Sequence, residues 1–446
     1  MAGEDIRKKD LKYNLHSWSA QGALNPIVVE KAEGIYFWDA DGKRYYDMSS
    51  QLVNVNIGHG NKKVIEAIKA QAEKLPNIGP GHAVDVRAEL ARKLIEEVAP
   101  DNMAKVFFTN AGAEANENAI KMARMYTGRN KIFSRYRSYH GATYGAANLT
   151  GEPRRFPSEP GIPGFVKFFD PYLYREPKQA KFASEKDYTD YCLAKLREQI
   201  VYEGRDNVAA IFMETVVGSN GVLIPPDGYM QGVREICDEF GIMMVCDEVM
   251  AGWGRTGEWF AINNWGVKPD MITFAKGVTS GYAPIGGVLV SKDISDYFND
   301  HVLYCGLTYS AHLIGCAAGI ATIDVYKEEK LLENAKAMGK VLNAELNKLR
   351  EKHPCVGEVR SIGLFGMVEF EKNSKTHEPI VPYAADPDKI MPKIVGKLKE
   401  NGFTTYSHEN MISVSPPLVV KEHEIKEGIA ILDKVCDWVD ETYVVE

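Results

Sequence analysis

The chain has 446 residues, a formal net charge of −8 at pH 7, 45% hydrophobic residues and 26% charged residues. This length suits two or three globular domains. The negative charge argues against nonspecific binding to nucleic acid or anionic membranes, and no apolar run approaches the ~18 residues of a transmembrane helix.

The first residues and the cysteines bear on the compartment. The segment MAGEDIRKKDLKYN has no apolar signal core. The seven cysteines are odd in number and form no Cys-x-x-Cys pair, a pattern that favours reduced thiols over a disulfide framework. We therefore expect a cytoplasmic protein.

The two ends of the chain carry their own strand and helix signals. Residues 34–39 are rich in aromatic side chains, and the dipeptide Asp41-Gly42 predicts a hairpin turn. We expect residues 1–60 to pack with residues 326–446 as a small α+β domain. The charged amphipathic stretch 321–352 predicts one long helix linking the two domains.

Residues 61–325 alternate short apolar runs with helical patterns. The runs lie at 105–110, 131–134, 209–214, 242–246, 271–274 and 287–290. This alternation predicts a large α/β domain whose mostly parallel sheet is covered by helices. Such sheets bind ligands at the carboxyl ends of their strands. The Pro- and Gly-rich stretch 151–190 predicts a long loop.

Four polar residues follow these apolar runs: Asn110, Glu214, Asp247 and Lys276. A buried acid and a buried amine at strand ends are costly unless something uses them. A pyridinium cofactor needs such a pair, because a lysine forms the imine and a carboxylate stabilises the protonated ring nitrogen. Taken alone, Asp247 and Lys276 would each also suit the protein surface.

Two turns could complete a cofactor site. The segment NAGAEAN at 110–116 joins a strand to a helix, and the backbone amides of Gly112 and Ala113 suit a phosphate group. The alternative is a plain strand–helix turn. Tyr139, at the start of YHGAT, could stack on a planar cofactor or serve as a core aromatic.

Other motifs argue against competing functions. Residues 252–257 match G-x-G-x-x-G by letter, but the following EWFAINN does not predict the helix that a dinucleotide site requires. We interpret this segment as a loop. His59 and His82 show no metal-ligand spacing, so no metal site is expected.

The motif set resembles class III pyridoxal-phosphate aminotransferases of fold type I, from residue 34 to residue 417. It comprises NAGAEAN, YHGAT, METVVGSNG, CDEVMAGWGRTG, FAKGVTSGYAPIGG and GLTYSAH, in this order. The resemblance implies that the cofactor is pyridoxal 5′-phosphate (PLP). It also implies that Lys276 is the Schiff-base lysine and proton shuttle, and that Asp247 pairs with the pyridine nitrogen.

The same resemblance implies further contacts and a homodimer. Gly112 and Ala113 hold the phosphate, and Thr308 reaches the phosphate of the neighbouring subunit, so the two active sites are shared. The remaining implied cofactor contacts are Tyr139 and Val249 on the two ring faces, Glu214 beside the ring and its hydroxyl, and His140. The substrates would be a small-molecule amine donor and a 2-oxo acid.

The substrate prediction depends on a few positions. Ala142 stands where 4-aminobutyrate and acetylornithine enzymes carry arginine, and YHGAT resembles the branch that acts on ω-amino acids, taurine and amines. Residues 16–59 and GEPRRFPSEPGIPG look most like taurine:2-oxoglutarate aminotransferases. Arg154 and Arg155 are candidates to bind a sulfonate or carboxylate, unless they are a solvated basic pair, and Trp18 is a candidate to line the pocket.

Several alternatives stay open. Many ω-aminotransferases carry an arginine shortly before the Ser-Pro-Pro-Leu segment, and residues 404–414 contain none. Pyruvate is therefore an alternative to 2-oxoglutarate as the acceptor. The alternative donors are β-alanine, 4-aminobutyrate and simple amines. A glutamate-1-semialdehyde aminomutase or a dialkylglycine decarboxylase would share the cofactor motifs.

Overall fold

A computed structural model describes residues 3–176 and 181–445. Its centre is a seven-stranded sheet in the order β4-β10-β9-β8-β7-β5-β6. All neighbouring strands from β9 to β6 run parallel, and β10 is antiparallel to β4 and β9. The predicted α/β fold with a mostly parallel sheet is confirmed. The strands are β4 (Met103–Thr109), β5 (Lys131–Arg135), β6 (Phe165–Phe168), β7 (Val208–Glu214), β8 (Met243–Asp247), β9 (Met271–Phe274) and β10 (Gly286–Ser291).

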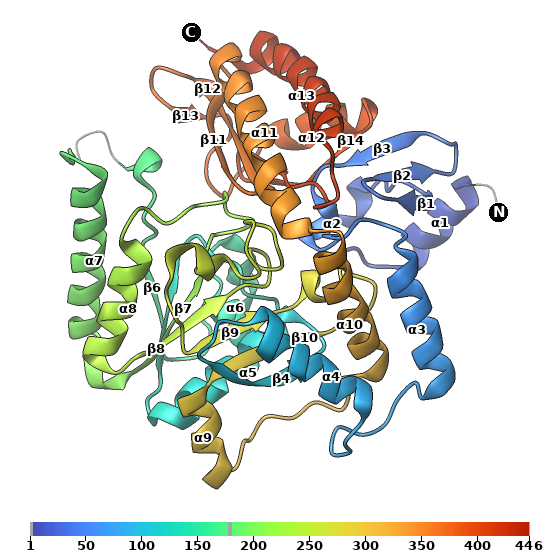
Figure 1. Ribbon diagram of the computed structural model, residues 1–446. Coiled ribbons are helices and arrows are strands. Elements are labelled where there is room, and N and C mark those ends of the chain that lie inside the picture. Colours follow the sequence, from blue (N-terminus) through green and yellow to red (C-terminus); the bar gives the residue numbers. More distant parts are fainter. Residues whose placement is uncertain (1–2, 177–180, 446) are drawn as a thin grey trace.

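Helices cover this sheet. Figure 1 shows α7 and α8 together at one flank and α10 packed with α3 and α4 at the other, while α5 packs across β10, β9 and β7. Because β7 is buried along its whole length, its run of apolar residues is continuous and does not alternate. The helices are α3 (Lys62–Lys74), α4 (Asp85–Lys93), α5 (Gly112–Thr127), α6 (Tyr144–Leu149), α7 (Glu185–Tyr202), α8 (Tyr229–Phe240), α9 (Lys292–Asp300) and α10 (Leu313–Glu328).

The two chain ends share a sheet. Strand β3 (Arg44–Asp47) pairs in parallel with β14 (Phe403–Thr404), which extends the hairpin strands β1 (Val29–Glu33) and β2 (Tyr36–Asp39). This pairing agrees with a small domain made from both ends, although the exact boundaries stay a prediction. The remaining N-terminal elements are α1 (Gly3–Tyr13) and α2 (Ser50–Val53).

The C-terminal part contains a further sheet with order β11-β12-β16-β15, and β13 pairs with β12. Long helices pack around it in Figure 1. The elements are α11 (Leu331–Lys352), β11 (Val356–Ile362), β12 (Phe365–Asn373), β13 (Glu378–Pro379), α12 (Ile390–Glu400), β15 (Ser407–His408), β16 (Met411–Val414) and α13 (Glu422–Tyr443).

Two sequence predictions about local structure are wrong. The stretch 321–352 is not one helix, because α10 ends at Glu328 and α11 begins at Leu331. The helix is interrupted at Lys330, whose backbone has a left-handed φ of 52°. The sequence does not predict this break, because no glycine or proline lies at this point. The stretch 151–190 is not all loop either, because it contains the edge strand β6 and the start of α7.

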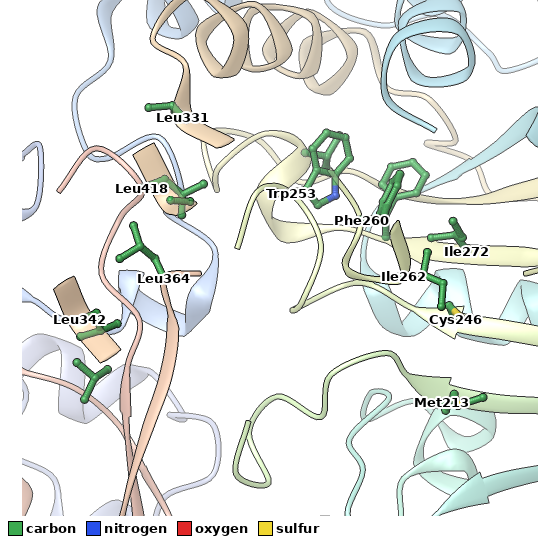
Figure 2. Close-up of a cluster of buried hydrophobic side chains, with 14 of the residues drawn as sticks. Met213, Cys246, Trp253, Phe260, Ile262, Ile272, Leu331, Leu342, Leu364 and Leu418 are labelled. Carbon is green, nitrogen blue, oxygen red and sulfur yellow. The ribbon is translucent and has the colours of Figure 1, made fainter. Parts of the chain in front are cut away.

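One hydrophobic cluster joins the central sheet to the C-terminal part (Figure 2). The side chains drawn come from strands of the sheet, from the loop after β8 and from the C-terminal part. The segment 252–257 lies in that loop, as predicted. Its buried Arg255 donates hydrogen bonds to the carbonyl oxygens of Leu364 (3.1 Å) and Ser415 (3.2 Å) and to Asn56 Oδ1 (2.7 Å). Hydrogen bonds from this loop therefore hold the central sheet to the C-terminal part of the molecule.

Across the described residues, no helix combines the length and apolar character needed to cross a membrane.

Candidate active site

A cavity of about 530 Å³ opens at the carboxyl ends of the central strands. Asn110 follows β4, Glu214 ends β7, Asp247 ends β8 and Lys276 follows β9, and all four side chains line this cavity. The structure thus brings together residues that are far apart in the sequence, at the edge where parallel sheets bind ligands.

Asp247 is the most firmly held carboxylate in the cavity. Its Oδ2 accepts hydrogen bonds from Asn116 Nδ2 (2.8 Å) and His140 Nδ1 (2.7 Å), and its Oδ1 accepts one from the Val249 amide (3.0 Å). Asp247 is only 3% exposed. Three donors therefore fix the position and orientation of this carboxylate at the end of β8.

Lys276 supplies the amine. Burial lowers the pKa of Lys276 to about 8, although the carboxylates of Asp247 and Glu214 act in the opposite direction. Its backbone φ is 47°, a left-handed conformation that costs of order 1 kcal/mol for a residue with a side chain. A Cβ on the next residue, Gly277, would lie 2.3 Å from Trp253 Cβ, so the tight turn after Lys276 requires glycine there.

The start of α5 forms a cradle opposite Val249. Gly112 is the first residue of this 16-residue helix, whose first N–H groups have no intrahelical acceptors. A Cβ on Gly112 would lie 2.9 Å from both Cγ atoms of Val249. The cradle therefore offers backbone amides and the helix dipole to an anion, and Val249 closes its side.

Glu214 and Tyr139 lie on another wall. Glu214 Oε1 accepts a hydrogen bond from the Tyr139 amide (3.0 Å), and Oε2 accepts one from the Gly218 amide (2.7 Å). Burial and the nearby Asp247 raise the pKa of Glu214, while His140 and these two amides oppose the rise. These bonds fix the backbone from which the Tyr139 ring faces the cavity.

The structure separates the two candidate arginines. The Arg154 guanidinium lies 3.8 Å from the centre of the Tyr139 ring and donates a hydrogen bond from Nη2 to Ser219 Oγ (3.0 Å). Tyr139 and Ser219 both line the cavity. Arg155 instead contacts Glu159 through Nε (3.0 Å) and the Gly151 carbonyl through Nη1 (2.7 Å). Its guanidinium therefore has other partners, and the geometry does not favour it as a substrate contact.

Of the remaining predicted positions, Trp18 and Ala142 lie at or beside the cavity and Thr308 does not. Trp18 packs edge-on against Tyr139, with ring centres 6.2 Å apart, and lies 5.4 Å from the Arg154 guanidinium. Ala142 lines the cavity. Thr308 is exposed and lies outside this cavity, and its contact with a neighbouring subunit stays a prediction.

Sequence reasoning missed Asn116, Ser219 and the buried Glu248. Asn116 is one helical turn after Gly112, so the helix period could have placed it on the same face. Glu248 accepts hydrogen bonds from Thr215 Oγ1 (2.6 Å) and the amides of Ala261 (2.8 Å) and Ile262 (2.9 Å). Burial raises its pKa to about 7. It anchors the loop after β8, which no sequence signal indicated.

Comparison with known proteins identifies the family. Residues 18–436 match the family model for class III aminotransferases. The chain belongs to the class III aminotransferases. It is an enzyme, and its cofactor is PLP.

Relatives and solved structures agree with this assignment. The chain is 50% identical to a taurine:2-oxoglutarate aminotransferase from Bifidobacterium kashiwanohense, solved with PLP and glutamate; 99% of each chain is covered, with a TM-score of 0.96. It is 35% identical to a putrescine–pyruvate aminotransferase of Pseudomonas aeruginosa, covering 92% of this chain and 90% of that one. It is 34% identical to a taurine–pyruvate aminotransferase of Bilophila wadsworthia, covering 97% of each.

The cavity of this aminotransferase fits PLP. A phosphate suits the amides at the start of α5, where no Cβ has room beside Val249. A protonated ring nitrogen suits the Asp247 carboxylate, and an amine of lowered pKa stands at Lys276. The arrangement can bind a planar phosphorylated aldehyde and move a proton beside it.

Proposed function

We propose that this aminotransferase moves the amino group of taurine to 2-oxoglutarate. The observation that carries the proposal is the Arg154 guanidinium at the edge of the cavity, in contact with Tyr139 and Ser219. Of the described residues that line the cavity, Lys276 is the only lysine or arginine. Arg154 is thus the cation placed to meet the anionic end of a donor whose amine reaches Lys276.

We propose the cofactor contacts that the family resemblance implies, and the position of these residues on the cavity wall supports them. Gly112 and Ala113 would bind the phosphate, Val249 and Tyr139 would pack on the two ring faces, and Glu214 would lie near the ring hydroxyl. His140 and Asn116 hold the Asp247 carboxylate, which keeps the ring nitrogen protonated. Bound PLP supplies the electron sink of the reaction.

Lys276 carries the proton transfer. With PLP held in this site, the Lys276 Nζ would act as the general base that takes the proton from the donor's amine-bearing carbon and as the general acid that returns it. Its lowered pKa of about 8 keeps a useful fraction of the amine neutral near pH 7. The reverse sequence aminates the 2-oxo acid.

Two relatives support different substrates. The Bifidobacterium enzyme is named for taurine and 2-oxoglutarate, and the Bilophila enzyme for taurine and pyruvate. We favour 2-oxoglutarate because the 50% identity to the first exceeds the 34% identity to the second. In the absence of an arginine between residues 404 and 414, Arg154 would serve the anionic groups of donor and acceptor in turn.

A donor and acceptor screen tests the proposal. Taurine, hypotaurine, β-alanine, 4-aminobutyrate, ornithine and putrescine are each paired with 2-oxoglutarate and with pyruvate. The highest kcat/KM is expected for taurine with 2-oxoglutarate. If taurine does not aminate the cofactor while 4-aminobutyrate or putrescine does, the taurine assignment is wrong.

We also propose that the enzyme is a cytoplasmic homodimer. The segment between α9 and α10 exposes Val302, Tyr304 and Tyr309 beside Thr308. Exposed apolar side chains gathered in one segment are typical of an interface between subunits, and they support the predicted contact of Thr308 with the neighbouring phosphate.

A further inference from the structure

Glu152 places a buried carboxylate beside Arg154. It is 0% exposed, and it precedes the short helical turn that contains Arg154. Its Oε1 accepts a hydrogen bond from Arg154 Nε, and its Oε2 accepts one from the Arg154 backbone amide (3.3 Å). Burial raises the pKa of Glu152, and Arg154 opposes that rise. His408 Nε2 lies farther away, at 3.7 Å from Oε2. Burying a carboxylate is costly, so the fact that both of its hydrogen bonds go to one residue calls for an explanation.

These contacts determine which edge of the guanidinium faces the cavity. Because Nε donates to Glu152, the two Nη groups are left for other acceptors. Nη2 donates to Ser219 Oγ (3.0 Å), and Nη1 has no hydrogen-bond acceptor among the residues that the structure describes. The Tyr139 ring, 3.8 Å away, supports one face of the guanidinium. Nη1, together with the second hydrogen of Nη2, therefore remains to bind the oxygens of an oxyanion.

We propose that Glu152 is a positioning residue for substrate recognition: its carboxylate orients Arg154 so that the Nη edge binds the sulfonate or carboxylate of the substrate. The proposal rests on the function proposed above. It predicts that Glu152 affects substrates that carry a sulfonate or carboxylate and leaves amines without such a group unaffected, because they make no use of Arg154.

A carboxylate suits this position better than an amide. Both oxygens of Glu152 accept, one from Nε–H and one from a backbone N–H. A glutamine has one acceptor oxygen, so its NH₂ group would face one of these donors. Glu152→Gln therefore preserves size while removing one of the two contacts.

The chain contains a matched control. Arg155, which follows Arg154 in the chain, contacts Glu159 through the Arg155 Nε atom (3.0 Å). The Glu159 side chain is 50% exposed. Glu159→Gln changes the same kind of ion pair in the same segment, but on an arginine whose partners lie outside the cavity. Both variants are compared with the unchanged enzyme and with Arg154→Leu.

The experiment follows the donor half-reaction of the PLP-loaded enzyme, without an acceptor, through the absorbance of the cofactor. The donors are taurine and propylamine, which has no anionic group; β-alanine replaces taurine if the enzyme does not react with taurine. For Glu152→Gln, the taurine concentration that gives half the maximal rate should rise ~10-fold. The maximal rate and the propylamine response should stay within about twofold, and Glu159→Gln should match the unchanged enzyme.

The outcomes separate the two proposals. If Arg154→Leu leaves the response to the anionic donor unchanged, the proposed role of Arg154 in the function is wrong. If Arg154→Leu weakens that response but Glu152→Gln does not, or if Glu152→Gln weakens both donors equally, the positioning role of Glu152 is wrong. The double variant should behave like Arg154→Leu alone, because Glu152 acts through that arginine.

A second variant covers the case in which Glu152→Gln does not retain PLP. Glu152→Asp keeps two acceptor oxygens on a shorter side chain. The same selective loss for the anionic donor is expected, and equal losses for taurine and propylamine would overturn the proposal.

Discussion

At the scale of single residues, the site contains two buried ionisable groups whose surroundings differ: Asp247 accepts several hydrogen bonds, and Lys276 is buried without comparable partners among the residues that the structure describes. The Asp247 carboxylate accepts three hydrogen bonds, which fix its position. Burial lowers the pKa of Lys276 to about 8. The carboxylate is therefore held in place by donors, while the amine can give up its proton.

Replacing Asp247 tests the first half of this arrangement. Asp247→Asn removes the negative charge with almost no change in size, so turnover should fall by roughly 100-fold or more. The melting temperature and circular dichroism should stay close to those of the unchanged enzyme. Near-normal kcat in a correctly folded variant would contradict the assignment of Asp247 as the partner of the ring nitrogen.

The pKa of Lys276 leads to a pH prediction. Only the neutral amine reacts with an aldehyde, and the lowered pKa moves the neutral form toward lower pH. The rate at which apoenzyme captures PLP should therefore rise about tenfold per pH unit below pH 8 and level off above it. Stopped-flow absorbance measures this rate. A rate that continues to rise to pH 10 would show that Lys276 keeps an ordinary pKa.

At the scale of elements, the start of α5 is shaped for close approach. A Cβ on Gly112 would lie 2.9 Å from two carbons of Val249. Gly112→Ala should therefore displace Val249 or the helix start and weaken PLP binding by ~10-fold, or about 1.4 kcal/mol. Equilibrium titration of apoenzyme with PLP measures the effect.

Gly396 provides the control for that substitution. It lies within α12, and a Cβ there would meet no heavy atom within 4 Å. Gly396→Ala should leave PLP affinity unchanged and stabilise the protein by ~0.5–1 kcal/mol, because alanine favours a helix. Equal losses of PLP affinity in both variants would show that the cradle at Gly112 is not specific.

At the scale of the whole molecule, the proposed dimer can be tested through Thr308. If this residue reaches the neighbouring subunit's phosphate, Thr308→Ala should weaken PLP binding severalfold without changing the sedimentation coefficient of a dimer. Analytical ultracentrifugation and PLP titration check both statements. A monomer that is fully active at the same concentration would contradict the shared site.

Much of the fold and of the cofactor site could be predicted from local sequence. Apolar runs, strand-end charges and the Gly-rich helix start placed Gly112, Asp247 and Lys276 together, because the carboxyl ends of parallel strands meet at one edge. The helix break at Lys330 and the edge strand β6 could not be predicted. No glycine or proline lies at Lys330 to mark the break. Strand β6 has only four residues and lies within a Pro- and Gly-rich stretch, which favours a loop in a reading of local sequence.

The sequence by itself determined the class of reaction. The motifs that carry it lie at strand ends, and the formation of the parallel sheet is enough to bring those ends together. Only the tertiary structure decided which of two adjacent arginines contacts residues that line the cavity. The sequence does not distinguish Arg154 from Arg155, because both are arginines at adjacent positions. In the structure, Glu152 and Tyr139 hold the Arg154 guanidinium beside the cavity. Glu159 binds the Arg155 guanidinium away from it. The direction of a long charged side chain depends on partners from several elements, and that information arises only when those elements pack.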